Sequence, residues 1–346
     1  MMKTKITELF GIKYPIVLPG MSWISTPELV AAVCNAGGIG WLATGPLSTK
    51  ETEASINKIR ELTKKPFGAG ATLLMPGAKE NLEVLIDMQV PVINVSLGKP
   101  DKIVERVHKY GGKVIQTVVN EKHGVAAVKG GVDALQVTGY EAAAHGGKVA
   151  NLCLIPYMRE KVNVPLVAAG GFSTGEGLAA ALALGADAVA MGTRLATTKE
   201  SPVHPRTKQA HLDAGVEDTL YSDRFDGLWC RVLKSKSAEK SIKAGMNFFK
   251  AAIAGPGIAK SMDLPVLKIM LGMLAQPRNM TTLAHMATAF SKIKAATEAG
   301  DFDVKGVQLI GQCCGLIHDI PTVKETIERI IKEAKNANTN LTNMFK

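Results

Sequence analysis

The sequence predicts an α/β fold, a (β/α)8 TIM barrel that carries a helical insertion or lid subdomain. Three observations lead to this class. Eight short apolar runs alternate with helical segments over about the first 200 residues, the connections are short, and glycines stand where several runs end. Eight strand–helix units are the number that closes a barrel of this kind, and its active sites lie at the carboxyl ends of the strands.

The expected strands are mostly uncharged and rich in Val, Ile, Leu and Ala, as is typical of strands buried on both faces of a parallel sheet. In chain order they span 16–21, 39–43, 67–74, 92–95, 113–119, 134–137, 164–169 and 188–191. The first helix begins at Thr26-Pro27-Glu28, because Pro suits the first helical position and an acid suits the first turn. Further helices are expected over 49–63, 80–88, 100–110, 122–129, 151–161 and 174–184.

The stretch 164–194 is the one around which we expect the site to be organised. Its two strands end at Gly170-Gly171 and at Gly192-Thr193. Backbone at glycine can approach a ligand closely, and its N–H groups can bind a phosphate, which in such barrels commonly lies after strands seven and eight. These glycines could instead only form turns and end helices. Two pairs about twenty residues apart in the same register favour the phosphate.

The pattern changes after Pro202. From about residue 212 to 299 there is no strand signal, only polar and basic helical segments interrupted by glycine and proline. We therefore expect a barrel over 1–211 and 303–346 and a helical substrate-side subdomain over 212–302 that covers the barrel mouth. We expect the segments 308–315 and 322–337 to form amphipathic helices that complete the barrel and pack on its outside.

Composition limits the class of function. The chain has 346 residues, a formal net charge of +10 and 46% hydrophobic residues, so it can bury a sizeable core. Its basic residues alternate with acids and only 5% of residues are aromatic, which argues against a nucleic-acid partner. No signal peptide, membrane span or cysteine motif with zinc spacing is found. A cytoplasmic protein without a membrane partner or a structural metal is expected.

The loop 139–147 is the most informative one outside the glycine turns. His145 follows the sixth strand and is flanked by alanines and glycines that are too small to bury it. An imidazole at the barrel mouth can act as a general base or acid near neutral pH. A single loop histidine is usually inert, but this position at a strand exit makes His145 the candidate catalytic residue.

Six segments together resemble the flavin-dependent 2-nitropropane dioxygenase family, which includes nitronate monooxygenases, a bacterial NADH:quinone reductase and flavin-type enoyl-acyl-carrier-protein reductases. They are 16–21, 35–38, 66–68, 141–147, 168–177 and 191–204. The similarity runs from about residue 5 to 215 and resumes from 306 to 332. The resemblance implies a flavoprotein whose barrel holds FMN.

The resemblance also implies the residues of the site. The family's catalytic histidine matches His145. The positions matched to the cofactor site are Gly20, Met21, Gly70, Gln116, Ala143, Ala144, Gly170, Gly171, Phe172, Gly192 and Thr193. Gly70 stands where the family often has an asparagine that contacts the flavin, so one hydrogen bond worth roughly 0.5 to 1.5 kcal/mol is missing. FMN binding is still expected.

The expected function is that of an FMN-dependent oxidoreductase of the nitronate monooxygenase type, which oxidises alkyl nitronates with O2. The alternative is an NAD(P)H-dependent reductase of an enoyl thioester or a quinone. A flavin-free barrel that isomerises or cleaves a sugar phosphate would need a lysine or carboxylate at a strand exit, where only Glu141 and Lys199 are candidates. The expected partner is a small-molecule substrate, and a homodimer is a further expectation.

Overall fold

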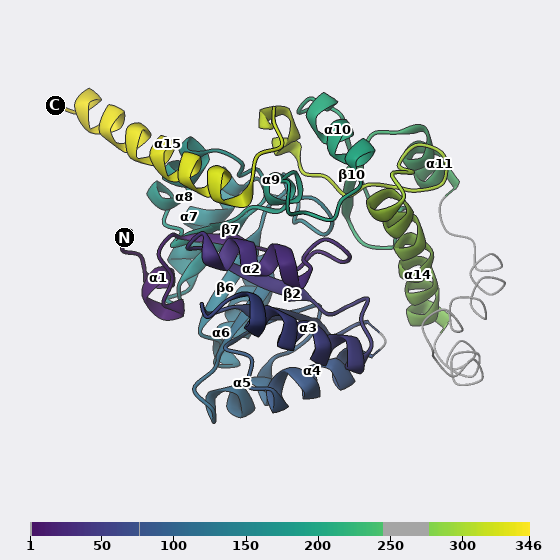
Figure 1. Cartoon of the computed structure of the whole chain (residues 1–346), viewed down its shortest axis with the longest axis horizontal. Helices are drawn as coiled ribbons and strands as arrows, with labels where there is room; N and C mark the ends of the chain where they lie inside the picture. The colour runs from purple at the N-terminus through teal and green to yellow at the C-terminus, as the bar shows by residue number, and fades with distance from the viewer. Residues whose placement is uncertain (1, 76, 245–276) are drawn as a thin grey trace.

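The computed structural model describes residues 2–75, 77–244 and 277–346. Its centre is a closed barrel of eight parallel strands in chain order, in which β8 pairs with β1, and this confirms the predicted fold class (Figure 1). The strands are β1 (Ile16–Leu18), β2 (Ile39–Ala43), β3 (Gly68–Thr72), β4 (Val92–Ser96), β5 (Lys113–Val118), β6 (Ala134–Thr138), β7 (Leu166–Ala169) and β8 (Ala188–Ala190).

Helices connect consecutive strands on the outside of the barrel, as predicted. They are α2 (Pro27–Asn35), α3 (Thr49–Leu62), α4 (Ala78–Asp87), α5 (Asp101–His108), α6 (Glu121–Lys129), α7 (Asn151–Lys161) and α8 (Gly175–Ala183), and the short α9 (Gly192–Ala196) follows β8. Local capping fixes where several of them begin. At α8, for example, the Thr174 hydroxyl accepts the N–H of Gly177 at 3.2 Å.

The two ends of the barrel interior are lined by side chains of different size. Toward the amino ends it is filled by Val17, Ile39 and Trp41, and α1 (Lys5–Phe10) closes this end with Phe10 packed edge-on against Trp41. Toward the carboxyl ends several inward positions are held by small residues, namely Ala43, Gly70, Ala169 and Ala190, beside the hydrogen-bonded side chains of Asn94, Thr117 and Gln136. The carboxyl end is therefore the end with room for a ligand.

The expectation that 212–299 contains no strand is wrong. β9 (Thr219–Ser222) and β10 (Cys230–Leu233) form an antiparallel hairpin, preceded by α10 (Pro205–Asp213) and followed by α11 (Lys236–Ala244) and α14 (Pro277–Glu298). Each strand has only four residues, and a buried arginine in β10 hides the apolar pattern that marks a short strand. Residues 245–276 of the predicted subdomain lie outside the described residues, and its boundaries stay a prediction.

This part of the chain contacts the loops at the carboxyl end of the barrel. The ring of Phe290 on α14 meets that of Trp23, in the loop after β1, with centroids 4.9 Å apart. Leu228, in the hairpin turn, joins Phe290 in a cluster with Met75 and Leu97, which follow β3 and β4. The hairpin and α14 therefore pack against the barrel mouth.

The C-terminal segment fulfils one expectation and contradicts another. Residues 308–315 do not form the expected amphipathic helix, because Leu309 pairs with Val232 of β10 and a 3-10 helix, η1 (Gln312–Leu316), follows. The helix predicted over 322–337 is α15 (Val323–Met344), which packs against α8. There the Glu333 carboxylate accepts the N–H of Gly175 at 2.8 Å.

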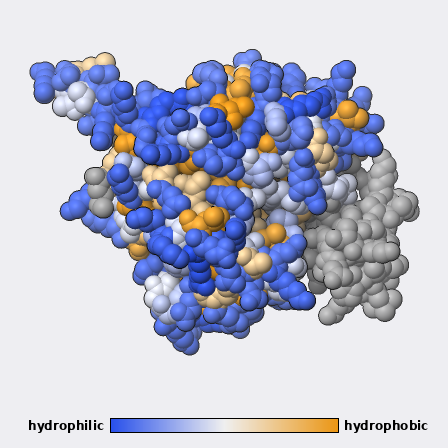
Figure 2. Space-filling view, in the orientation of Figure 1, coloured by the Kyte–Doolittle hydropathy of each residue, from blue (hydrophilic) through white to orange (hydrophobic). Residues whose placement is uncertain are grey.

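The face shown in Figure 2 is mostly hydrophilic. None of their helices combines the length and the apolar composition needed to span a bilayer. Figure 2 shows hydrophobic residues as small separate patches among hydrophilic ones on the face in view. The most exposed large apolar side chains are those of Phe345, Met344 and Leu152. The predicted homodimer stays a prediction.

A buried histidine links α10 to α9. His211 Nδ1 lies 2.8 Å from the Thr197 hydroxyl, which donates to the carbonyl of Thr193, and His211 Nε2 has no partner among the described residues. Burial lowers the pKa of His211 from 6.5 to about 4, and the charges of Lys208 and Arg194 act in the same direction.

This shift predicts acid sensitivity of the fold. Between pH 6.5 and about 4 the unfolded chain binds a proton at His211 that the folded chain does not, so the free energy of unfolding falls as pH decreases through this window. The expected slope is about 1.4 kcal/mol per pH unit. Urea unfolding at several pH values should show a smaller slope for His211→Gln than for the natural chain. Equal slopes would show that His211 does not titrate in this way.

Candidate active site

All predicted site residues lie at or just beyond the carboxyl ends of strands, because parallel strands of a closed barrel present these ends to one side. Gly20 and Met21 follow β1, Gly70 is in β3, and Gln116 is in β5. Ala143, Ala144 and His145 follow β6, Gly170 to Phe172 follow β7, and Gly192 and Thr193 begin α9 after β8.

The turn after β7 requires glycine, and the phosphate site expected at the two glycine turns stays a prediction. Gly170 and Gly171 have φ values of +100° and +82°, a region that favours glycine, and a Cβ on Gly170 would lie 2.8 Å from Ala142. Among the described residues no side chain caps the amino end of α9, so the first N–H groups of this helix have no side-chain partner there. The Thr193 hydroxyl accepts the N–H of Gly311 at 3.0 Å, so Thr193 offers its backbone.

The carboxyl end of the barrel tolerates added atoms at three glycines and has unused polar atoms. A Cβ on Gly20, Gly70 or Gly192 would meet no atom closer than 3.8, 3.6 and 3.4 Å, respectively. Two buried hydroxyls, those of Thr138 at the end of β6 and Ser173 after β7, have no hydrogen-bond partner among the described residues. Buried polar groups are normally paired, so a polar ligand such as FMN fits these positions.

Gln116 is placed differently from the other predicted residues. It shares a face of β5 with Val114 and Val118, which belong to the core between strands and helices, whereas Ile115 lines the barrel. Its amide donates to the carbonyl of Gly98 at 2.9 Å and its Oε1 has no partner among the described residues. The β5 residue on the inward face near the mouth is Thr117, so the side chain of Gln116 does not point into the barrel.

The hairpin β9–β10 holds the loop that carries His145. The backbones of Ala144 and Arg231 exchange two hydrogen bonds, at 3.1 and 2.9 Å, although Ala144 has a φ of +54° that is unusual for alanine. The Tyr221 hydroxyl donates to the carbonyls of Gly146 and Gly147 at 3.0 and 3.1 Å. The hairpin thus fixes the residue before His145 and the two residues after it.

The buried Arg231 adds further contacts between the hairpin and the loop that carries His145. The Arg231 guanidinium, on a residue that is only 2% exposed, donates to the Tyr140 carbonyl at 2.8 Å and to the Thr219 hydroxyl at 2.7 Å. It also lies over the rings of Tyr140 and Tyr221, 4.4 and 5.1 Å from their centroids. Loop and hairpin therefore form one rigid unit.

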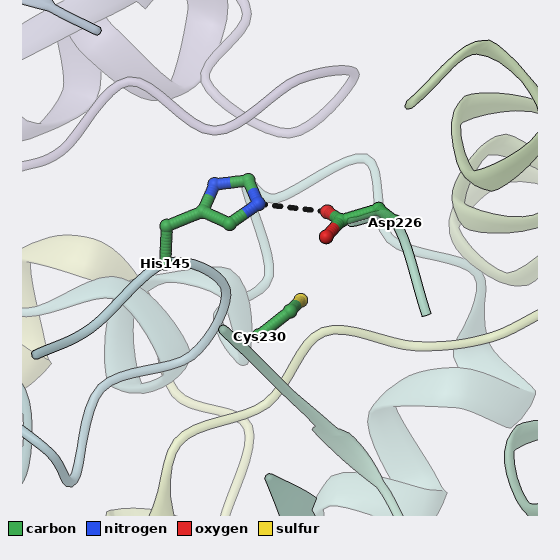
Figure 3. A group of neighbouring side chains, drawn as sticks. All are labelled: His145, Asp226 and Cys230. Carbon is green, nitrogen blue, oxygen red and sulfur yellow. Dashed lines mark hydrogen bonds and ion pairs between the residues drawn. The ribbon is translucent and has the colours of Figure 1, made fainter. Parts of the chain in front are cut away.

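The result is a histidine–aspartate pair at the barrel mouth (Figure 3). His145 Nε2 lies 2.7 Å from an Asp226 carboxylate oxygen, and the side chains are 32% and 6% exposed, respectively. The other carboxylate oxygen of Asp226 accepts the N–H of Leu228 at 3.1 Å. A buried carboxylate that accepts an imidazole N–H fixes the orientation of the ring, so the pair is arranged for general acid–base chemistry.

Two more groups border the pair. The Cys230 side chain points toward it, and burial together with the nearby charge of Asp226 raises the pKa of this thiol well above its usual value. His285 of α14 is also close enough for the charge of Asp226 to act on it. Burial lowers the pKa of His285, and the Asp226 charge partly opposes this effect.

Comparison with known proteins agrees with this geometry. The family model described as nitronate monooxygenase matches residues 3–81 and 70–333. The chain belongs to this family. A carboxyl-CoA dehydrogenase of Mycobacterium tuberculosis, whose substrate is a hydroxylated methyl-oxo-octahydroindene, is 34% identical over 343 residues, which cover 96% of each chain. A probable nitronate monooxygenase of Staphylococcus aureus is 28% identical over 284 residues, which cover 69% of this chain and 80% of that protein.

Solved structures that are similar to this chain share its fold over nearly the whole length. FabK of Thermotoga maritima superposes with a TM-score of 0.84 at 32% identity, covering 99% of this chain and 100% of FabK. A nitroalkane oxidase of Streptomyces ansochromogenes superposes with a TM-score of 0.79 at 26% identity, covering 98% of this chain and 100% of that one. The family resemblance is confirmed, and the chain is an oxidoreductase of this family.

The sequence analysis did not identify Asp226, Cys230 or Arg231 as site residues. All three lie in the segment that was expected to be helical, 81 or more residues after His145 in the chain. An isolated Asp among polar residues gives no signal of its own. The one usable hint was Thr219 to Tyr221, a β-branched and aromatic run typical of a strand.

Proposed function

We propose that the protein is an FMN-dependent oxidoreductase that removes a proton from a carbon beside an electron-withdrawing group, with His145 as the base. The observation that carries this proposal is the 2.7 Å contact between His145 Nε2 and the buried Asp226 carboxylate. A base that is held and stabilised in this way is needed for a substrate that still carries its proton. FMN, when bound, would supply the redox chemistry by accepting two electrons.

We further propose a coenzyme A thioester as the preferred substrate class. The thioester carbonyl acidifies the neighbouring C–H bond, so His145 takes the α-proton while a hydride leaves the β-carbon, and the acyl chain is left with a C=C bond. Relatives at 34 and 35% identity over 96% of this chain are named carboxyl-CoA dehydrogenases. The net charge of +10 suits an anionic coenzyme A substrate.

In the opposite direction the same residues would serve the predicted reductase of an enoyl thioester or quinone. His145 would then donate its proton to the acceptor, Asp226 would hold the ring in place, and NAD(P)H would be the electron donor. Microscopic reversibility gives the pair the same role in both directions.

Nitronate oxidation with O2 is the second candidate function. It is supported by the family model and by the nitronate monooxygenases at 28% identity. Here His145 would deprotonate a neutral nitroalkane or donate a hydrogen bond to the nitronate oxygen. A flavin-free sugar-phosphate barrel loses its candidate carboxylate, because Glu141 accepts the backbone N–H of Asn151 at 3.0 Å and caps α7.

Anaerobic flavin reduction discriminates between these functions. The FMN-loaded protein is mixed with cyclohexanecarboxyl-CoA, with a nitronate or with NADH, and the visible absorbance of the flavin is followed. Bleaching by the acyl-CoA, slowed when its α-hydrogen is replaced by deuterium, is the expected result. Bleaching by the nitronate alone would make nitronates, and not thioesters, the substrate class. Bleaching by NADH alone would favour the reductase.

A further inference from the structure

Three side chains of the types that bind Zn²⁺ converge beside the barrel mouth (Figure 3). The ligand atoms of His145, Asp226 and Cys230 all lie within 4.8 Å of one another. His145 belongs to the loop after β6, Asp226 to the turn between β9 and β10, and Cys230 to the start of β10. The sequence predicts no metal site, because its cysteines and histidines form no closely spaced ligand motif. This group of ligands exists only after folding.

Small side-chain movements bring this group to metal-binding geometry. In a tetrahedral zinc site with bonds of roughly 2.0 to 2.3 Å, the ligand atoms are roughly 3.3 to 3.8 Å apart. The present separations run from 2.7 Å, between His145 and Asp226, to no more than 4.8 Å. Each must therefore change by about 1 Å or less. Rotation of the half-exposed imidazole and of the carboxylate provides such a change.

The backbone already holds two of the ligands opposite one another. The paired hydrogen bonds between Ala144 and Arg231 join the residue before His145 to the residue after Cys230. The partly exposed imidazole gives a path from solvent, while the thiol and the carboxylate lie at the buried end of the group. A metal would thus bind a site whose frame is fixed before it arrives.

We propose that His145, Asp226 and Cys230 form an inhibitory Zn²⁺ site with a fourth position open to water or substrate. Three protein ligands and one open position are a common zinc arrangement, and a thiolate with an imidazole selects Zn²⁺ over Mg²⁺ and Ca²⁺. The ion replaces the Nε2 proton that His145 donates to Asp226, and so holds the imidazole that the proposed function, on which this inhibition rests, uses as the base. Binding displaces the thiol proton into solvent, so proton release accompanies it.

The test uses the full-length, FMN-loaded protein and ZnCl2. Calorimetry should show one Zn²⁺ per chain with proton release, and X-ray absorption should show a Zn–S bond of roughly 2.3 Å. Cys230→Ser should lose this sulfur signal and weaken binding by ~100-fold or more. Cys153→Ser is the matched control, because Cys153 is an exposed free thiol, and it should change neither measurement. MgCl2 should not compete.

Inhibition is measured as the ratio of rates with and without Zn²⁺, which should return toward one in Cys230→Ser. If that variant unfolds, His145→Gln tests the same site through a partly exposed ligand. The proposal is overturned if Zn²⁺ does not bind, if the sulfur signal survives in Cys230→Ser, or if it disappears in Cys153→Ser. A protein that binds Zn²⁺ but turns over no substrate contradicts the proposed function and not the metal site.

Discussion

His145→Gln is expected to slow flavin reduction by a substrate that must lose a proton by ~10²- to 10⁴-fold, the usual contribution of a general base. Glutamine keeps a donor for the buried Asp226 carboxylate but cannot take up a proton, so the fold and the bound flavin should be retained. Anaerobic stopped-flow measurement of the flavin absorbance gives the rate, and thermal unfolding checks the fold.

Comparison of substrates separates catalysis from binding. A neutral nitroalkane should be slowed far more than the preformed nitronate, which has already lost its proton, and an acyl-CoA should behave like the nitroalkane. Equal slowing of nitroalkane and nitronate would make His145 a binding residue. Asp226→Asn should cost less, roughly 10- to 100-fold, because it removes one charge-assisted hydrogen bond and leaves the base in place.

Gly192→Val is expected to give a folded protein without flavin. A Cβ at this position points into space bordered only by Met21 and Pro19, at 3.4 and 3.6 Å, so the substitution fills the proposed ligand volume without displacing the barrel backbone. Gly171 is less suitable for this test, because its φ of +82° would strain any other residue. The visible spectrum and FMN released on denaturation measure the loss.

Gly215→Val is the matched control. Gly215 follows α10, its Cβ would meet only Asp218 at 3.4 Å, and it lies outside the predicted phosphate turns. This variant should remain fully loaded with flavin. If Gly192→Val also keeps its flavin while its melting temperature is unchanged, the phosphate lies elsewhere than at the turn after β8.

The barrel follows from local signals in the sequence. Its eight strands are short and mostly apolar, and several boundaries carry a local signal, such as the Thr174 cap of α8 or the glycines after β7. Because β–α units in chain order close into a barrel only with their carboxyl ends together, the same local signals placed His145 and the two glycine turns on one side.

The groups that act on His145 are brought to it by tertiary packing. Asp226 and Cys230 lie in and beside the turn of a hairpin whose strands are held by contacts to the barrel loops, through Arg231, Tyr221 and the pairing with Ala144. None of these contacts is local in the chain, so neither hydrophobic periodicity nor a helix cap predicts them. The same holds for Gln116, which motif matching assigned to the cofactor but whose strand face is set by the barrel register. Local propensity fixes the elements, whereas the partner of a polar side chain depends on packing between segments that are distant in sequence.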